Sequence, residues 1–178
     1  LGGEMGRVAD ARVQFEAAAK LKSRRRDMYL QWVAMEIGEK EWSRAISVAD
    51  RAIKVFPDFY EMMERKIFAK KQAGFDFHRG LHREKAEKMW REAAEDAKSH
   101  LKPPEALSTG ERAISSAIYC AAVICLDMLG ETRERNRWLE DWATEHPGDP
   151  QVERQRQILI QKHGWFTVPA ASGRRLGA

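Results

Sequence analysis

The chain contains 178 residues, of which 43% are hydrophobic and 33% are charged, and its formal net charge is only +4. This length is sufficient for a continuous core. The small net charge gives no strong indication that the chain as a whole binds polyanions. The longest uncharged run, residues 113–126, is shorter than the roughly 20 apolar residues that span a bilayer, so we predict a buried helix there and no membrane partner.

Two similar segments near the start of the chain indicate a repeat of 34 residues. Ala11 and Ala45 occupy the same place in residues 6–18 and residues 40–52, and the two alanines are 34 residues apart. Self-similarity at a period of roughly 20–50 residues is typical of stacked helix pairs. The sequence therefore predicts an all-α fold assembled from such pairs.

The first unit is predicted to be incomplete. In the 34-residue register, Gly6 falls at the turn between the two helices of a pair, and the helix after it has an apolar stripe formed by Val8, Ala11, Phe15 and Ala18. Leu1 would then lie inside the first helix of the same pair. Since the chain begins there without Met, we expect a piece of a longer array.

The second unit, residues 26–59, shows the pattern most clearly. Its first helix is expected around Trp32, its turn at residues 38–40, and its second helix from there to Pro57, which closes it. The second helix has an apolar face at helical spacing, formed by Trp42, Ala45, Ile46, Ala49, Ala52, Ile53 and Phe56. Alanine at a helix crossing allows close backbone approach, and the neighbouring aromatic side chains fill the remaining space.

Trp42, Ala45, Ala52 and Pro57 resemble the aromatic, small, small and proline positions of the tetratricopeptide (TPR) repeat. The resemblance implies a right-handed α-solenoid of TPR-like helix-turn-helix repeats that ends in a C-terminal capping helix. The helical domain would cover residues 1–163 and be followed by an irregular tail at 164–178. Its expected parts are a truncated first repeat, repeats near 26–59, 60–103 and 108–148, and a capping helix at 150–163.

Residues 60–103 depart from the 34-residue period. The capping-box pattern Asp58-x-x-Glu61 predicts the start of a helix that runs to about Gly74. Ala86 follows Ala45 by 41 residues, and the excess of seven residues is assigned to a loop at 75–80. The next helix is expected to end before two prolines and has an apolar stripe formed by Ala86, Met89, Trp90, Ala93, Ala94, Ala97 and Leu101.

The fourth unit returns to the register of the second. A Ser-x-x-Glu capping box at Ser108 predicts its start, Gly130 its internal turn and Pro147 its end. Asp149 is then expected to cap the last helix, with Pro150 at the first helical position. The largely polar surface of this helix suits the end of a solenoid.

No residue pattern in the chain points to catalysis. The phosphate-binding, dinucleotide-binding and zinc-protease motifs are missing, as is Cys-x-x-Cys. His78 and His82 lie four residues apart near Glu84, which suits a metal on one helix face, but Gly80 between them and the lack of a third ligand favour an ordinary loop-to-helix junction. We therefore expect no enzyme activity, no metal and no cofactor.

Cys120 and Cys125 are the only cysteines, and five residues of helix would point their thiols about 140° apart. They are therefore predicted to be unpaired, buried thiols. Such thiols fit a reducing compartment, so we expect a cytoplasmic protein.

In the tetratricopeptide family, the first helix of each repeat lines a concave groove that binds a peptide. The resemblance implies that the partner-binding residues are Asp27, Leu30, Ala34, Glu61, Glu64, Phe68, Ala117, Cys120 and Ile124. Leu30 and Ala34 replace the Lys and Asn of the family's carboxylate clamp, which disfavours capture of a peptide C-terminus. Leu30, Phe68 and Ile124 suit an apolar or amphipathic segment instead. Alternatively, neighbouring helices or the tail cover these positions.

Tyr29, Trp32 and Glu36, followed by residues 45–53 and Pro57, also resemble the half-a-tetratricopeptide (HAT) repeat of RNA-processing scaffolds over about the first two units. That resemblance implies a ribonucleoprotein component whose RNA contacts would be Lys20, Lys22, Arg24, Arg25 and Arg26. A helical regulatory domain of a larger enzyme is a third interpretation. We expect a noncatalytic scaffold that binds another protein or peptide.

Overall fold

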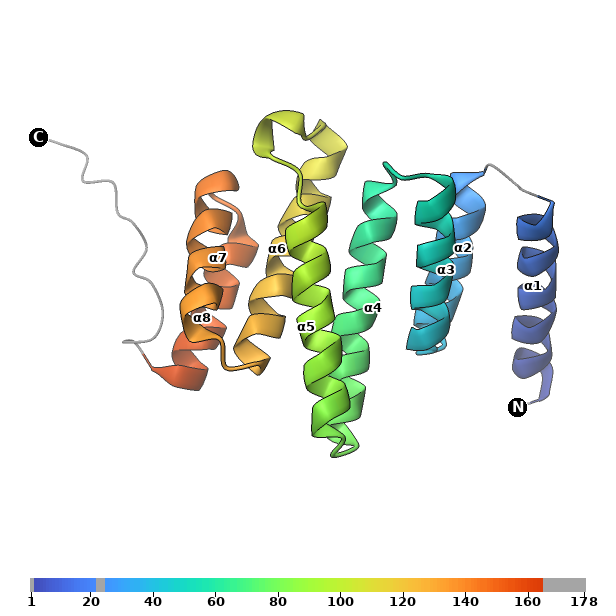
Figure 1. Cartoon of the computed structure of the whole chain (residues 1–178), viewed down its shortest axis with the longest axis horizontal. Coiled ribbons are helices and arrows are strands. Elements are labelled where there is room, and N and C mark those ends of the chain that lie inside the picture. The colour runs from blue at the N-terminus through green and yellow to red at the C-terminus, as the bar shows by residue number, and fades with distance from the viewer. Residues whose placement is uncertain (1, 22–24, 165–178) are drawn as a thin grey trace, which may run out of the picture.

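The structure, a computed structural model, describes residues 2–21 and 25–164, and all regular structure in these ranges is helical. Figure 1 shows the helices standing side by side in chain order along the long axis of the molecule. A short 3-10 helix at Pro104–Ala106 precedes α6. The α-helices are α1 (Gly2–Lys20), α2 (Arg26–Gly38), α3 (Trp42–Val55), α4 (Tyr60–Arg79), α5 (Arg83–His100), α6 (Thr109–Met128), α7 (Thr132–Glu145) and α8 (Pro150–His163).

The described helices form two layers. Consecutive helices pack together, and the main further contacts join α2 with α4, α4 with α6, and α6 with α8. These four helices therefore form one layer. α3, α5 and α7 each pack between two members of that layer, because each contacts the helix before it and the helix after it.

The buried side chains follow the apolar stripes that the sequence predicts. Ala45, Ala49 and Ala52 of α3 are fully buried, as are Ala86, Ala93 and Ala97 of α5 together with Trp90 at 2% exposure. Aromatic side chains fill the space beside these small residues; Phe75 and Trp90, for example, make an edge contact with ring centroids 5.4 Å apart. The predicted helical phase of both stripes is confirmed.

The turns inside the three helix pairs share one backbone geometry. Each has a residue in the left-handed region, Lys40 with φ 57°, Leu81 with φ 61° and Gly130 with φ 73°. In each, the next backbone N–H donates to a carbonyl of the preceding helix: Glu41 to Glu36 at 2.9 Å, His82 to Phe77 at 2.8 Å, and Glu131 to Leu126 at 3.0 Å. Ala45, Ala86 and Arg135 consequently occupy equivalent positions in α3, α5 and α7.

The loop predicted at residues 75–80 is wrong, because α4 continues through Arg79. α4 has 20 residues, whereas α2 has 13. Because the seven additional residues make about two full helical turns, the residues before and after them keep their apolar side chains on the same face of the helix. Gly74, where the helix was expected to end, is helical and buried, and a Cβ there would collide with the Trp90 indole. The α4–α5 turn consequently projects beyond the neighbouring turns (Figure 1).

The structure also differs from the sequence prediction at two other places, Gly6 and Asp58. Gly6 lies inside α1 and not at a turn. The capping box at Asp58 is absent, because α4 has Phe59 at its N-cap and the Asp58 carboxylate binds Arg26 at 2.6 Å instead. Leu1 and the tail after Gly164 lie outside the described residues.

Two predicted helix starts are confirmed. The Ser108 backbone N–H donates to Glu111 Oε2 at 3.0 Å, and Asp149 Oδ1 accepts from the Gln151 backbone N–H at 2.9 Å. Of the described helices, only α6 is long and apolar enough to cross a membrane. Half of its apolar stretch is buried inside the fold, so this is weak evidence for a membrane-spanning helix. Packing against α4, α5, α7 and α8 accounts for its apolar composition.

Candidate interaction groove between α4, α6 and α8

A hollow of about 370 Å³ lies on the layer formed by the even-numbered helices. Four of the nine predicted partner-binding residues line it, namely Glu64, Phe68, Ala117 and Cys120. The complete lining consists of Glu64, Phe68 and Lys71 from α4, Ala113, Ser116, Ala117, Cys120 and Ala121 from α6, and Asp149 and Gln151 at the start of α8. We call this hollow, with its lining residues, the interaction groove.

The α4 side of the groove combines an aromatic ring with two charges. Glu64, Phe68 and Lys71 follow one another at spacings of four and three residues, so they share one helix face. The Lys71 ammonium lies 4.9 Å from the centroid of the Phe68 ring. Burial raises the pKa of Glu64, whose nearest cationic partner is Arg65 at 3.8 Å.

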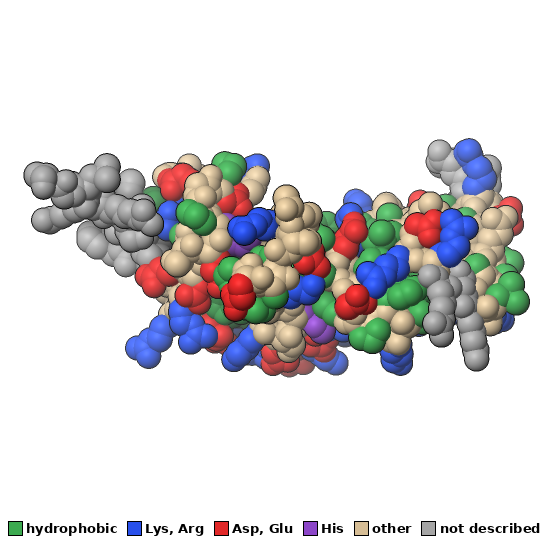
Figure 2. All heavy atoms as spheres, turned by 90° about the horizontal axis from the view of Figure 1, so that it is seen from above, with side chains coloured by type: hydrophobic (Ala, Val, Ile, Leu, Met, Phe, Trp, Pro, Cys, Tyr) green, Lys and Arg blue, Asp and Glu red, His purple; other side chains and the backbone are tan. Residues whose placement is uncertain are grey.

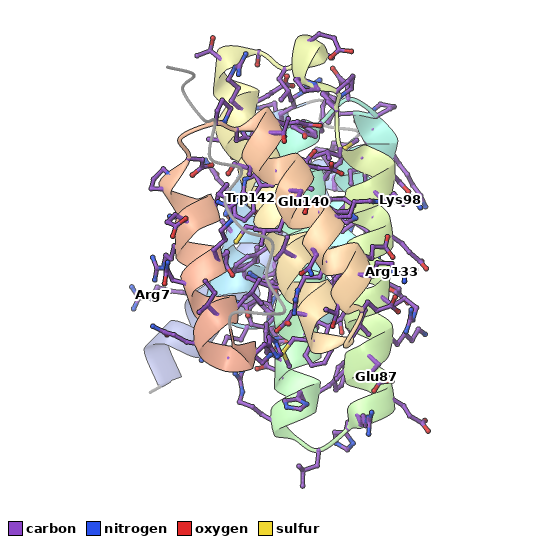
Figure 3. The ribbon with its side chains drawn as sticks, turned by 90° about the vertical axis from the view of Figure 1, so that its left-hand side faces the viewer. Arg7, Glu87, Lys98, Arg133, Glu140 and Trp142 are labelled. Atoms are coloured by element: carbon purple, nitrogen blue, oxygen red, sulfur yellow. The ribbon has the colours of Figure 1, made fainter. Side chains whose placement is uncertain are left out.

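The α6 and α8 side is held in place by buried hydrogen bonds. The Ser116 hydroxyl donates to Asp149 and accepts from Trp142 Nε1 at 2.9 Å. Trp142 is fully buried, and Figure 3 shows it pointing from α7 into the molecule. Because Asp149 also caps α8, this network joins α6, α7 and α8 into one wall.

Cys120 contributes an uncharged thiol to the groove. Burial raises its pKa, and burial raises the pKa of Cys125 to about 12. A neutral thiol is a poor nucleophile, so the two cysteines act as small apolar side chains here. Both are free cysteines, as predicted, although Cys120 is only partly buried.

The other five predicted partner-binding residues do not line this hollow. Asp27 and Ala34 are exposed on α2, while Leu30 packs against the core shared by α2 and α3. Glu61 lies 3.8 Å from Arg65, and Ile124 is partly buried on α6. The groove therefore joins α4, α6 and α8, and none of its lining residues lies on α2.

Of the three described residues in the basic cluster predicted as an RNA-binding alternative, two are paired with carboxylates. Arg25 binds Asp27 at 2.6 Å, and Arg26 binds Asp58 at 2.6 Å. Arg26 also lies over the rings of Phe56 and Phe59, at 5.1 and 5.2 Å. Lys20 is exposed at the end of α1, and Lys22 and Arg24 lie outside the described residues.

His78 and His82 do not share a helix face. His78 lies in the last turn of α4, whereas His82 is the N-cap of α5 across the turn. Each ring contacts an aromatic side chain: His78 lies 5.6 Å from Trp90, and His82 lies 6.4 Å from Phe77. Among residues 2–21 and 25–164, no three metal-ligating side chains form a cluster.

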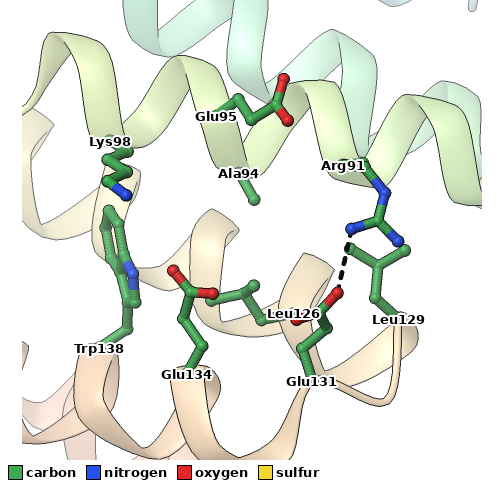
Figure 4. A pocket seen from close by; sticks show the side chains of 9 residues that line it. All are labelled: Arg91, Ala94, Glu95, Lys98, Leu126, Leu129, Glu131, Glu134 and Trp138. Atoms are coloured by element: carbon green, nitrogen blue, oxygen red, sulfur yellow. Dashed lines mark hydrogen bonds and ion pairs between the residues drawn. The ribbon is translucent and has the colours of Figure 1, made fainter.

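A second hollow, of about 190 Å³, lies between α5, α6 and α7. Figure 4 shows the Trp138 indole at one end of it and the Arg91–Glu131 ion pair, with an N–O distance of 3.0 Å, at the other. It is about half the volume of the interaction groove, and this ion pair already joins its two walls. Of these two hollows, the groove is therefore the better candidate for a binding site.

Sequence reasoning missed Lys71, Ser116 and Asp149 as parts of the site. Lys71 follows Phe68 by three residues, so helical spacing alone could have added it to the predicted face. Ser116 and Asp149 are 33 residues apart, close to the repeat period, which is the only sequence signal that they meet.

Comparisons with protein-family models, curated proteins and solved structures give no match to this chain. Its function is therefore argued from its own residues and geometry.

Proposed function

We propose that this chain is a TPR-like, right-handed α-solenoid that acts as a noncatalytic scaffold and binds a segment of another protein. Two observations support the repeat architecture. The same left-handed turn recurs after α2, α4 and α6, and the first helices of successive pairs contact one another as a layer. In such an array the layer of first helices provides the binding surface.

The observation that carries the functional proposal is the composition of the interaction groove. Phe68, Ala117 and Cys120 provide an apolar surface, while Glu64 and Lys71 provide polar groups that fix orientation. Half of the lining residues are polar, but the surface that the hollow exposes is mostly apolar, as is usual for a binding site. Its volume accommodates one or two side chains of a partner, so it acts as an anchor point within a longer contact.

Charge pairing favours a protein partner over RNA. Arg25 and Arg26 each face a carboxylate, which reduces the positive potential available to phosphates. Figure 2 shows both signs of charge interspersed with hydrophobic side chains on the face seen from above. RNA binding by the HAT-like interpretation remains the alternative outcome of the test below.

Phe68→Glu tests the scaffold function by placing a charge in the groove. Wild type, Phe68→Glu and the matched control Val55→Glu are used as bait in a native extract, with and without ribonuclease. Val55 is 43% exposed on α3, away from the groove. We expect proteins that wild type and Val55→Glu recover equally, that Phe68→Glu loses, and that ribonuclease does not release.

Circular dichroism of each variant checks that helicity is retained. If all three baits recover the same proteins, the groove is not the binding surface. If ribonuclease abolishes every interaction, the RNA-scaffold interpretation replaces the one proposed here.

A further inference from the structure

Lys71 lies at the edge of the interaction groove and has no acidic partner among residues 2–21 and 25–164. None of the ion pairs within the described residues includes its ammonium group, which lies over the Phe68 ring. The other two lysines of α4 are paired with carboxylates on the neighbouring helices: Lys70 binds Asp96 on α5 at 2.7 Å, and Lys66 binds Asp50 on α3 at 2.8 Å. A carboxylate on a molecule bound in the groove could therefore form an ion pair with Lys71.

Glu64 and Lys71 lie two helical turns apart on the same face of α4. Seven residues of helix correspond to about 10.5 Å. Phe68 lies between them, so the face reads acid, aromatic, base along α4. A second helix lying along this face would match it with the opposite charges at the same seven-residue spacing and with an apolar side chain between them.

Small side chains line the opposite wall, over which such a helix would lie. Ala113, Ala117 and Ala121 recur every four residues on α6 and line the groove beside Phe68. Small side chains allow helix axes to approach closely. Asp149, on the same side, is already engaged by Ser116 and by the Gln151 backbone N–H. Glu64 makes only a long contact with Arg65, at 3.8 Å, so it is the lining carboxylate that a partner's cation would pair with.

Building on the proposed scaffold function, we infer that the occupant of the groove is an amphipathic helix of another protein. It carries a carboxylate that pairs with Lys71, an apolar side chain that packs on Phe68 and Ala117, and, seven residues from the carboxylate, a lysine or arginine that faces Glu64. The inference fixes both the charge pattern and the spacing of the partner segment.

A displayed library of helical 16-residue peptides with randomised surface positions tests this inference on the full chain. We expect selected peptides to carry Asp or Glu and Lys or Arg seven residues apart, flanking a Leu, Met or Phe. Lys71→Glu should weaken their affinity by about tenfold or more, and replacing the peptide's acid by lysine should restore it. Lys88→Glu, at a lysine on α5 that is 72% exposed, is the charge-matched control and should change nothing.

The outcomes separate this inference from the scaffold function. Peptides that lose binding with Phe68→Glu but lack the charge pattern, or that tolerate Lys71→Glu, would overturn the inference and leave the scaffold intact. Failure to select any peptide sensitive to Phe68→Glu would overturn the inference, and the extract experiment above would then decide the scaffold function by itself. Selection that succeeds only after residues 165–178 are removed would make this chain's own segment the occupant and overturn the inference.

Discussion

At the scale of single residues, Arg135 is the clearest departure from the repeat pattern. It occupies the position at which Ala45 and Ala86 pack in the other two pairs, and it is only 1% exposed. Its guanidinium donates to Asp127 at 2.7 Å. Asp127 also binds Lys162 at 2.6 Å and the His163 ring at 2.7 Å, so one carboxylate connects α6, α7 and the end of α8.

Asp127→Asn is predicted to destabilise the protein at neutral pH and to lose this effect in acid. Burial would raise the pKa of Asp127, but hydrogen bonds from Lys162, Arg135 and His163 outweigh it and lower the pKa. A folded-state pKa below the unfolded one gives stability that is present above about pH 4 and is lost as the pH falls through the folded pKa. The free-energy difference between wild type and variant should therefore shrink between about pH 5 and pH 2.

Denaturant titrations at each pH provide the measurement, with Asp141→Asn as control because Asp141 is an exposed carboxylate on α7. A difference that stays constant down to pH 2 would show that the ion pairs of Asp127 do not contribute.

Ala45→Leu is predicted to cost on the order of 1–3 kcal/mol of unfolding free energy, because Ala45 is fully buried between α3 and α2 and a larger side chain overpacks that crossing. Ala34→Leu adds the same atoms at an exposed site on α2 and should change the free energy little. Urea denaturation compares the two, and equal stabilities would contradict the assigned helix crossing.

At the scale of elements, the three turns inside the helix pairs accept different residues at one left-handed position. Gly130 adopts φ 73° without penalty, whereas Leu81 holds φ 61° with its side chain 91% exposed. Leu81→Gly is therefore predicted to stabilise the chain by about 1 kcal/mol, and Gly130→Ala to destabilise it by a similar amount. Thermal and urea unfolding measure both. If Leu81→Gly lowers stability, the Leu81 side chain has a contact that the turn geometry does not account for.

Element boundaries show how far the sequence predicts this fold. The stripes through Ala45 and Trp90 follow from helical spacing, and both are buried as predicted. The loop at 75–80 is wrong because a seven-residue insertion preserves helical phase, so the pattern alone does not distinguish two extra turns from a loop. Gly74 resembles a helix end in the sequence, but the structure uses it because the indole of Trp90, 16 residues later, occupies the space of a side chain there.

The candidate site was predictable only where one helix face supplies it. Glu64 and Phe68 follow from the helical spacing of α4, and Ala117 and Cys120 from that of α6. The packing between helices decides which faces meet and places Asp149 at the end of the groove. No local sequence pattern encodes this packing. Asp58 illustrates the same limit, because Arg26 on another helix decides its role.

At the scale of the whole molecule, stability is distributed unevenly along the row of helices. α4 and α6 each contact helices before and after them as well as each other, whereas α1 contacts α2 sparingly. α1 is attached by Arg12, whose guanidinium binds Glu36 at 2.6 Å, by Glu16, which binds Arg51 of α3 at 2.8 Å, and by Phe15, which stacks on Trp32 with centroids 5.7 Å apart. Where helices contact mainly their neighbours along the chain, stability comes from each helix and its nearest neighbours.

Amide hydrogen exchange should therefore show a gradient, with α1 exchanging first and the centres of α4 to α6 last, because α1 opens without breaking other interfaces. Phe15→Ala removes the stacked ring and should accelerate exchange in α1 by tenfold or more, which corresponds to a loss of about 1.4 kcal/mol. Val13→Ala is the control, since Val13 lies on the same helix at 68% exposure. Mass spectrometry of peptic fragments resolves the two ends of the chain. Uniform protection from α1 to α8, unchanged by Phe15→Ala, would mean that the molecule opens as one cooperative unit and not helix by helix.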